Sequence, residues 1–352
     1  MKSVFMITAA ALLLSISCSD NPGGPEYINP VDNVPDESIS YKIALLADES
    51  GYVNKEIFII NSNGTGLTPL PESGGALKPR DLQWSPDGSY IIYSVDGDIH
   101  SVKSDGTDHS ILTSGDSYEI KPRWSPESTR IAYLKDGDLF IMNKDGSNSI
   151  GLTNNRDIRD IDWKPDGSCI VFSVGSGISF FREIYRIDID GSHYTQLTFD
   201  DAFNSAPVFS PDGSRIAYLS GPDFPENLYI KNIYIMNSDG SNKICLTVSV
   251  GGVSGAPQWS PDGSRIAFVY TDDKGYGPDI CTMRPDGTDK WRLTLKQRAF
   301  ESKWSPDGAS IAYLEGLSYE LRQLRIMTLN GTQKKVLAPG LFVREFSFCP
   351  VR

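Results

Sequence analysis

The chain has 352 residues, 39% of them hydrophobic, which suits one large domain or two small ones and is too apolar for a disordered protein. Its 33 Lys and Arg against 45 Asp and Glu give a net charge of −12, which repels phosphate backbones, so we expect no nucleic-acid partner. The 32 Gly and 22 Pro recur at regular intervals, which indicates many short strands joined by turns.

The N-terminal segment reads as an export signal. Lys2 precedes an uncharged apolar run from Val4 to Ile16, which is long enough for a signal peptide and too short for a membrane-spanning helix. The segment that ends in Ser17-Cys18 resembles the lipobox of bacterial lipoproteins, although Ser15 stands where these proteins usually have Leu. The resemblance implies a lipidated Cys18 as the mature N-terminus. A secretory signal cleaved elsewhere is the alternative.

Residues 18–40 follow the predicted signal peptide, residues 1–17. They are rich in Pro, Asp, Asn and Gly, so we predict a flexible tether from the lipidated Cys18. Ser19 stands where an Asp would direct retention in the inner membrane of enteric bacteria. We therefore expect a lipid anchor in the bacterial cell envelope, on the periplasmic side of the outer membrane or at the cell surface.

One motif, an aromatic residue followed by Ser-Pro-Asp-Gly or a close variant, recurs six times. Successive copies lie about 40 to 50 residues apart, the spacing of four-stranded propeller blades. Pro and Asp favour a turn, and Gly takes the left-handed conformation that other residues avoid. Ser128 replaces this Gly in the second copy, so we expect a strained residue there. The copies begin at Trp84, Trp124, Trp163, Phe209, Trp259 and Trp304.

A second turn signal, Asp-Gly or Asn-Gly, occurs seven times and predicts a hairpin between the third and fourth strands of each blade. The chain enters the first blade at a second strand, residues 42–46, and residues 343–348 resemble the missing first strand. We predict an all-β fold over residues 41–352, a single seven-bladed β-propeller of four-stranded antiparallel blades, closed by the C-terminal strand that completes the first blade. Six blades are the alternative. The hairpin residues before Gly are Asn63, Asp105, Asp145, Asp190, Asp239, Asp286 and Asn330.

These motifs resemble the WD40-like repeat of the bacterial TolB propeller family. The resemblance covers nearly all of the chain beyond the tether and implies a propeller of the cell envelope. TolB proteins have a further domain before a six-bladed propeller, whereas this chain has a tether and seven predicted blades. The resemblance therefore implies the fold and leaves the role of TolB in the Tol system open.

Cofactor chemistry has little support in the residue pattern. The Cys beyond Cys18 lie far apart without a CxxC pair, and the chain has only three His, so we predict buried free thiols, no metal and no cofactor. Turn formation accounts for the Asp-Gly pairs, and a calcium site would need more converging oxygens. The four Cys are Cys169, Cys245, Cys281 and Cys349.

Catalytic signatures are also missing from the sequence. There is no Gly-x-Ser-x-Gly elbow and no His-x-x-x-His pair, so we predict a binding protein and not an enzyme. Carboxylates are abundant, however. The alternative is therefore a carbohydrate-active propeller enzyme, a glycosidase or lyase that uses carboxylates at the channel mouth.

The connections between strands differ on the two faces of the predicted ring. Short uniform turns join first to second and third to fourth strands on one face, which we call the turn face. Longer, variable connections leave the other face, the loop face, where repeat proteins place function. In blades four to six they carry an aromatic set that suits protein binding, with local packing as the alternative. This set is Phe180, Phe181, Phe224, Tyr229 and Tyr276, with a charged rim of Arg182, Glu183, Asp223 and Lys274.

The fourth-to-first connections lead toward the central channel on the same face. Their charged and aromatic residues form a polar binding site or a solvated rim. The candidate residues of this channel mouth are Arg80, Asp81, Arg159, Asp160 and Phe203. We predict a monomeric, lipid-anchored scaffold of the cell envelope that binds an envelope protein or a glycan and contacts the membrane through its lipid anchor only.

Overall fold

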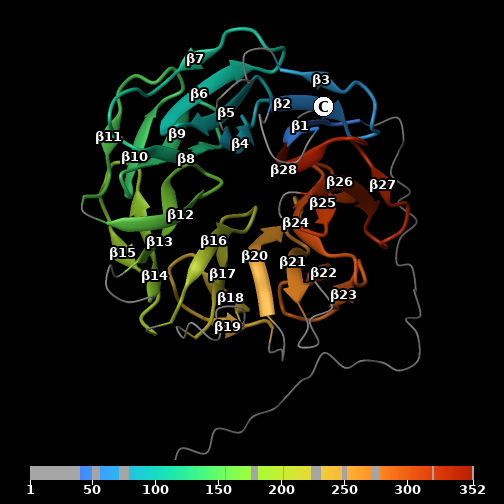
Figure 1. Ribbon diagram of the computed structural model, residues 1–352. Coiled ribbons are helices and arrows are strands. Elements are labelled where there is room, and N and C mark those ends of the chain that lie inside the picture. Colours follow the sequence, from blue (N-terminus) through green and yellow to red (C-terminus); the bar gives the residue numbers. More distant parts are fainter. Residues whose placement is uncertain are drawn as a thin grey trace, which may run out of the picture.

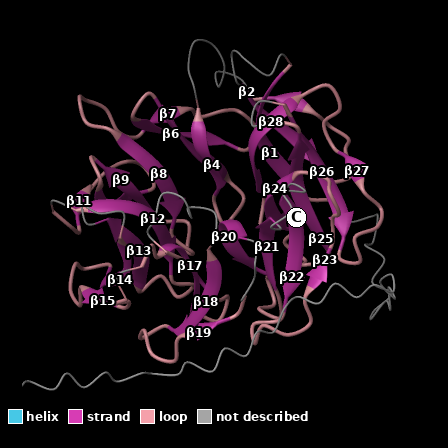
Figure 2. Ribbon diagram, turned by 60° about the horizontal axis from the view of Figure 1, so that its bottom comes forward, coloured by secondary structure: helices cyan, strands magenta, loops and turns pink. Residues whose placement is uncertain are grey.

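Seven four-stranded antiparallel sheets surround a central axis (Figure 1), which confirms the predicted seven-bladed β-propeller and excludes six blades. The computed structural model describes residues 40–49, 56–70, 79–154, 156–175, 181–200, 202–222, 231–247, 252–271, 278–318 and 321–350. Every regular element in these ranges is a strand (Figure 2), so no helix there has the length and apolar character to cross a membrane. The predicted signal peptide, Cys18 and the tether up to residue 39 lie outside these ranges.

Each blade runs from an innermost strand at the axis to a two-residue outermost strand. Blades one to three consist of β28 (Phe342–Phe348), β1 (Lys42–Asp48), β2 (Glu56–Asn61) and β3 (Thr68–Pro69); β4 (Arg80–Trp84), β5 (Tyr90–Val95), β6 (Asp98–Lys103) and β7 (Ser110–Ile111); and β8 (Glu119–Trp124), β9 (Arg130–Lys135), β10 (Asp138–Asn143) and β11 (Ile150–Gly151). Blades four and five consist of β12 (Asp157–Trp163), β13 (Cys169–Gly175), β14 (Arg182–Asp188) and β15 (Thr195–Gln196); and β16 (Ser205–Phe209), β17 (Arg215–Ser220), β18 (Asn232–Asn237) and β19 (Ile244–Cys245). Blades six and seven consist of β20 (Gly252–Trp259), β21 (Ile266–Thr271), β22 (Pro278–Met283) and β23 (Trp291–Arg292); and β24 (Ala299–Trp304), β25 (Ser310–Gly316), β26 (Arg322–Thr328) and β27 (Lys335–Val336).

The ring closes through the C-terminal strand, as the sequence predicts. β28 pairs antiparallel with β1, in a register that places Phe346 opposite Leu45 and Phe348 opposite Ile43. Figure 1 shows β28, in red, beside β1, in blue. Closure pairs β28 with β1, so no second strand keeps an open edge. The innermost strands turn their unpaired edges to the axis, and the edges at the rim are the short outermost strands, which limits edge-to-edge aggregation.

The motif turns owe their regularity to a Ser and an Asp that bond each other. In blade two, the Ser85 hydroxyl donates to Asp87 Oδ1 (2.6 Å) and accepts from the backbone N–H of Tyr90 (2.9 Å), while the N–H of Ser89 donates to Asp87 (3.0 Å). The Ser is buried, so its hydroxyl satisfies backbone groups that water does not reach. The same bonds recur at Ser210, Ser260 and Ser305.

The Asp-Gly and Asn-Gly hairpins share a second local bond. In every blade the Asp or Asn side chain accepts a hydrogen bond from the backbone N–H two residues later, as from Thr107 to Asp105 (2.9 Å). In five of the six other blades the hydroxyl of the residue two positions later also donates to this Asp or Asn. In blade four, Asp190 accepts only from the N–H of Ser192. These bonds explain why the residues recur without any bound ion, because short polar side chains favour such turns.

The recurring Leu-Thr pair at the end of the fourth strand has a structural role that the sequence analysis did not assign. In blade six the Thr294 hydroxyl accepts from the N–H of Ile280 (2.9 Å) and donates to Asp279 Oδ1 (2.8 Å). Blades three to five repeat this arrangement with Asp138, Glu183 and Asn232 as the acceptors. The pair therefore ties the fourth strand to the loop-face end of the third.

The motif aromatics pack between blades, with only Trp259 partly exposed. Three of their indole N–H groups donate to a backbone carbonyl of the preceding blade, for example from Trp163 to Arg123 (3.1 Å). Side chains that directly precede the aromatics add further cross-blade bonds, such as that from the N–H of Trp124 to Gln83 (2.9 Å). Neighbouring blades are thus joined by hydrogen bonds as well as by apolar contact.

Ser128 has the predicted left-handed conformation, with φ of +59°, and its hydroxyl accepts from the N–H of Asp87 in blade two (3.0 Å). Ser128→Gly removes a strain of about 1–2 kcal/mol but also a hydrogen bond of about 0.5–1.5 kcal/mol, whereas Ser128→Ala loses the bond and keeps the strain. We expect the free energy of unfolding, measured by urea denaturation, to be about 1–2 kcal/mol higher for Ser128→Gly than for Ser128→Ala. Equal stability of the two variants would contradict this account.

Candidate functional site

The innermost strands present a set of charged side chains to the axis. In β4 the buried Leu82 and Trp84 alternate with the half-buried Asp81 and Gln83, and the other innermost strands follow a similar alternation. The positions one and three residues before each motif aromatic therefore form two levels around the axis. Their charged members, the axis set, are Asp81, Lys121, Arg123, Asp160, Asp162, Glu301, Lys303 and Glu345.

β-Bulges in the innermost strands determine how the outer level is held. The register shifts in β4, β8 and β16, and Asp81, Lys121 and Ala206 have φ between +51° and +58° at these bulges. The N–H of Lys121 donates to Asp81 (3.1 Å), and that of Ala206 donates to Asp160 (3.1 Å). Each of these two carboxylates therefore holds the bulge of the following blade.

Two of the predicted mouth residues, Asp81 and Asp160, are joined through Lys121. The Lys121 ammonium lies 3.5 Å from Asp160 and also donates to the carbonyl of Arg159. Burial alone would raise the pKa of Asp160, but Lys121, the N–H of Ala206 and the Ser173 hydroxyl together hold that pKa below its ordinary value. Asp160 is therefore an ionised structural group and a poor proton donor.

Phe203, the third mouth residue in this region, has two cations over its ring. The Arg182 guanidinium lies 4.5 Å and the Lys231 ammonium 4.0 Å from the ring centroid. The backbone fixes this arrangement, because the N–H of Arg182 donates to Ala202 (3.1 Å) and that of Asn204 donates to Arg182 (3.0 Å). Burial lowers the pKa of both Arg182 and Lys231, and the charge of Asp160 acts in the opposite direction on each.

The two remaining mouth residues lie outside this contact network through their side chains. The Arg159 guanidinium pairs with Asp157 (2.7 Å) in the same strand, and the Arg80 guanidinium lies over the ring of Tyr118, 5.8 Å from its centroid. The structure thus brings Asp81, Asp160 and Phe203 together through Lys121 and Arg182. We call Lys121, Asp160, Arg182, Phe203 and Lys231 the mouth cluster.

Two further carboxyl groups of the axis set, Asp162 and Glu345, hold their protons to unusually high pH. Burial raises the pKa of Asp162 to about 7, against the opposing N–H of Phe209, which donates to it (2.8 Å), and the charge of Arg123. Burial likewise raises the pKa of Glu345 to about 7, with Lys303 opposing this shift. The charges that act on Glu345 come from blades two, three and seven, which places these side chains around one axis.

The predicted aromatic set is only partly within the described ranges. Phe181 is half-buried, while Phe180, Phe224, Tyr229 and Tyr276 lie outside the described residues. Of the predicted rim, Arg182 belongs to the mouth cluster and Glu183 bonds the buried Thr198 and Asn204, whereas Asp223 and Lys274 lie outside the described ranges.

Other apolar side chains are exposed on the loop face. Leu317, Phe199 and Leu295 have exposed fractions of 77%, 72% and 63%. All three lie in second-to-third or fourth-to-first connections, and no other large apolar residue of the described ranges is as exposed. Leu317 directly follows β25, whereas Phe199 and Leu295 directly follow the Leu-Thr pairs of blades four and six, so no repeat pattern marks them in the sequence.

The His and Cys residues lie away from the mouth cluster. His100 and His109 contact each other (3.1 Å) beside Tyr93 on the outer strands of blade two. All four Cys of the described ranges are free; Cys169, Cys281 and Cys349 are buried as predicted, whereas Cys245 in the short edge strand β19 is partly exposed. No group of three or more His, Cys, Asp or Glu within those ranges could hold a metal ion.

Comparison with known proteins supports a TolB-like propeller fold for the chain. It is 35% identical over 155 residues to the Tol-Pal system protein TolB of Francisella tularensis subsp. mediasiatica, a match that covers 43% of this chain and 34% of the relative. The Protein TolB homolog of Chlorobaculum tepidum is 33% identical over 113 residues, which is 32% of this chain and 24% of the relative. The matched region thus spans about a third or less of these relatives, and no family model matches the chain.

Solved structures share the fold at low sequence identity. TolB from Acinetobacter baumannii superposes with a TM-score of 0.56 at 15% identity, over 88% of this chain and 82% of that chain. An oligogalacturonate lyase in complex with manganese gives a TM-score of 0.65 at 16% identity, over 85% of each chain. These similarities support the propeller fold, which TolB and a lyase share, and the fold does not determine the function.

Proposed function

We propose that the protein is an exported, lipid-anchored envelope protein whose propeller is a non-catalytic scaffold that binds a protein partner through the loop face. The exposure of Leu317, Phe199 and Leu295 on that face carries the proposal, because exposed apolar side chains with charged neighbours are typical of protein-binding surfaces. The sequence similarity to TolB, named for the Tol-Pal system, supports an envelope partner. In this proposal the chain is attached at the turn face and binds its partner through the loop face.

The two predicted mouth carboxylates, Asp81 and Asp160, are taken up by structural contacts. A glycosidase needs one carboxyl that donates a proton and a second one that acts as base or nucleophile. Asp81 accepts bonds from Ser94 (2.8 Å) and from the N–H of Lys121, and the pKa of Asp160 is lowered. Both groups serve the bulges of neighbouring blades, so the proposal does not include the carbohydrate-active alternative.

Loop-face variants test the scaffold role. We expect Phe199→Ser combined with Leu317→Ser to weaken cross-linked capture of the partner from envelope extract several-fold, because each change removes exposed apolar surface from the interface. The bait is the full chain with a C-terminal tag, and the measurement is the yield of the partner by quantitative mass spectrometry. The melting temperature is expected to stay unchanged, since neither side chain is buried.

Two controls separate the faces. Asp105→Asn and Asp145→Asn alter the turn face while keeping the turn, because Asn63 and Asn330 make the same bonds in blades one and seven. Ile111→Ser removes an exposed apolar side chain from the outer edge of blade two. If these controls reduce capture as much as the loop-face pair, the loop face is not the binding surface.

Acylation of Cys18 is tested separately. We expect Cys18→Ala to abolish incorporation of labelled fatty acid and to leave the precursor unprocessed, because the thiol is the acceptor of the lipid. Labelling at the wild-type level in the variant would show that the chain is not anchored through this residue. The conservative Ser19→Ala variant is expected to be labelled normally.

A further inference from the structure

The mouth cluster combines three cations with a single carboxylate. Lys121 pairs with Asp160, whereas neither the Arg182 guanidinium nor the Lys231 ammonium has a hydrogen bond or ion pair from its side chain within the described ranges. Both side chains are half-buried, and each is held over the ring of Phe203. A chain with a net charge of −12 thus places two unneutralised cations at one end of its axis.

The positions of these cations are set by the backbone and not by long flexible connections. Arg182 begins β14 and forms a parallel bridge with Phe203, while the N–H of Phe203 donates to Gly221 (3.0 Å) in blade five. Lys231 directly precedes β18, and its carbonyl accepts from Val253 (2.9 Å) in blade six. Since the anchoring segments belong to three successive blades, the cations are preorganised.

Preorganised, partly desolvated cations bind anions more strongly than solvated ones. Burial lowers the pKa of both side chains and the charge of Asp160 opposes this shift only in part, so an arriving anion would add to that compensation. A guanidinium presents parallel N–H groups that match the two oxygens of a carboxylate, and a nearby ammonium adds a further donor.

We propose that Arg182 and Lys231, held over Phe203, form a binding site for the side-chain carboxylates of an acidic segment in the protein partner. This inference rests on the proposed protein-binding function and names the chemistry that the partner presents to the ring axis. The paired Lys121 and Asp160 border the site. The negative charge of Asp160 repels an anion that is not in contact with Arg182 and Lys231, and this repulsion restricts binding to the position over the two cations. Because the whole chain has a net negative charge, binding of an acidic segment depends on the local positive charges of Arg182 and Lys231.

A defined probe tests the site without the native partner. Fluorescein-labelled hexaglutamate is titrated with the full chain at low ionic strength, and binding is followed by fluorescence anisotropy. We expect saturable binding that weakens as salt is added, because ion pairs near a surface are screened. Lys231→Gln and Arg182→Gln should each raise the dissociation constant about tenfold, while Lys231→Arg should largely restore binding, as expected for a charge-assisted contact.

The matched control is Lys144→Gln, which removes one positive charge from the turn face and leaves the mouth cluster intact. Absence of hexaglutamate binding overturns the proposal. The proposal is also overturned if Lys144→Gln raises the dissociation constant as much as Arg182→Gln or Lys231→Gln does. Binding of trigalacturonate in place of hexaglutamate would assign the site to a uronate glycan and also overturn it. Failure of this probe leaves the partner-capture result of the loop-face variants unaffected, so the two proposals can fail separately.

Discussion

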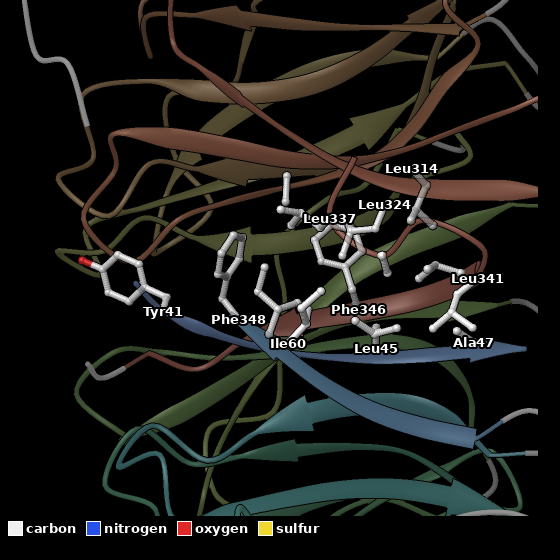
Figure 3. Close-up of a cluster of buried hydrophobic side chains, with 14 residues drawn as sticks. Tyr41, Leu45, Ala47, Ile60, Leu314, Leu324, Leu337, Leu341, Phe346 and Phe348 are labelled. Atoms are coloured by element: carbon white, nitrogen blue, oxygen red, sulfur yellow. The ribbon is translucent and has the colours of Figure 1, made fainter. Parts of the chain in front are cut away.

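Phe346→Ala is expected to lower the free energy of unfolding by about 3–5 kcal/mol, the cost of removing a large buried aromatic side chain. Phe346 is fully buried in β28 and packs in the cluster between blades one and seven, beside Leu45 and Leu324 (Figure 3). Because β28 closes the ring, the cavity opens at the only joint between chain ends. Urea denaturation of the full chain measures the effect.

Leu317→Ala is the matched control for this change. It also truncates a large apolar side chain in the last blade, but at an exposed position, so we expect a change within about 0.5 kcal/mol. A loss from Phe346→Ala no larger than that of Leu317→Ala would show that the closing strand contributes little to stability.

Glu345→Gln is expected to stabilise the protein at pH 8 and to have little effect at pH 5. Burial raises the pKa of Glu345 to about 7 in the folded protein from 4.5, so the native state keeps a proton that the unfolded chain has lost between these values. Stability therefore falls as pH rises through this window, by up to about 1.4 kcal/mol per pH unit for this group. The Gln variant lacks this slope.

The measurement is the melting temperature of both proteins from pH 4.5 to pH 8. Asp145→Asn is the control, because hydrogen bonds from Ser147 lower the pKa of Asp145, and the contribution of that group changes only in acid below its ordinary value. If wild type and the Glu345 variant keep a constant difference across the range, the carboxyl of Glu345 does not titrate near pH 7. The replacement of Asp162 by Asn should show a similar dependence.

The blade architecture was predictable because its signals are local. Each turn is encoded within about five residues, as in the bonds among Ser85, Asp87 and Tyr90, and repetition multiplies the evidence. Closure followed from the same logic, since the chain carries one unpaired first strand at its end. The Leu-Thr pair can also be found in the sequence. The acidic or amide residue at or near the start of the third strand is what indicates that the Thr hydroxyl bonds to it.

The candidate site was only partly predictable. Asp81 and Asp160 were predicted, but the bulges put Asp81, Lys121 and Ala206 in left-handed conformations that no Gly indicates in the sequence, so the place of Lys121 between these two carboxylates was not predicted. Lys231 was missed because its partner Phe203 lies in another connection of the ring, and the contact depends on how blades four and five pack. The repeated motif predicts the blades, but the variable connections between strands have no repeat, so their contacts cannot be predicted in the same way.

The joint between β28 and β1 also determines at which face of the ring the two ends of the described chain lie. β1 starts at the turn face, as every second strand does, and Lys42 there accepts a hydrogen bond from the N–H of Cys349 (2.8 Å). Both ends of the described chain thus leave the ring on the side away from the mouth cluster. Under the proposed attachment through Cys18, the tether would join the ring at the turn face and leave the loop face unobstructed. The surface with the exposed apolar residues would then be free to meet a partner from the far side of the compartment.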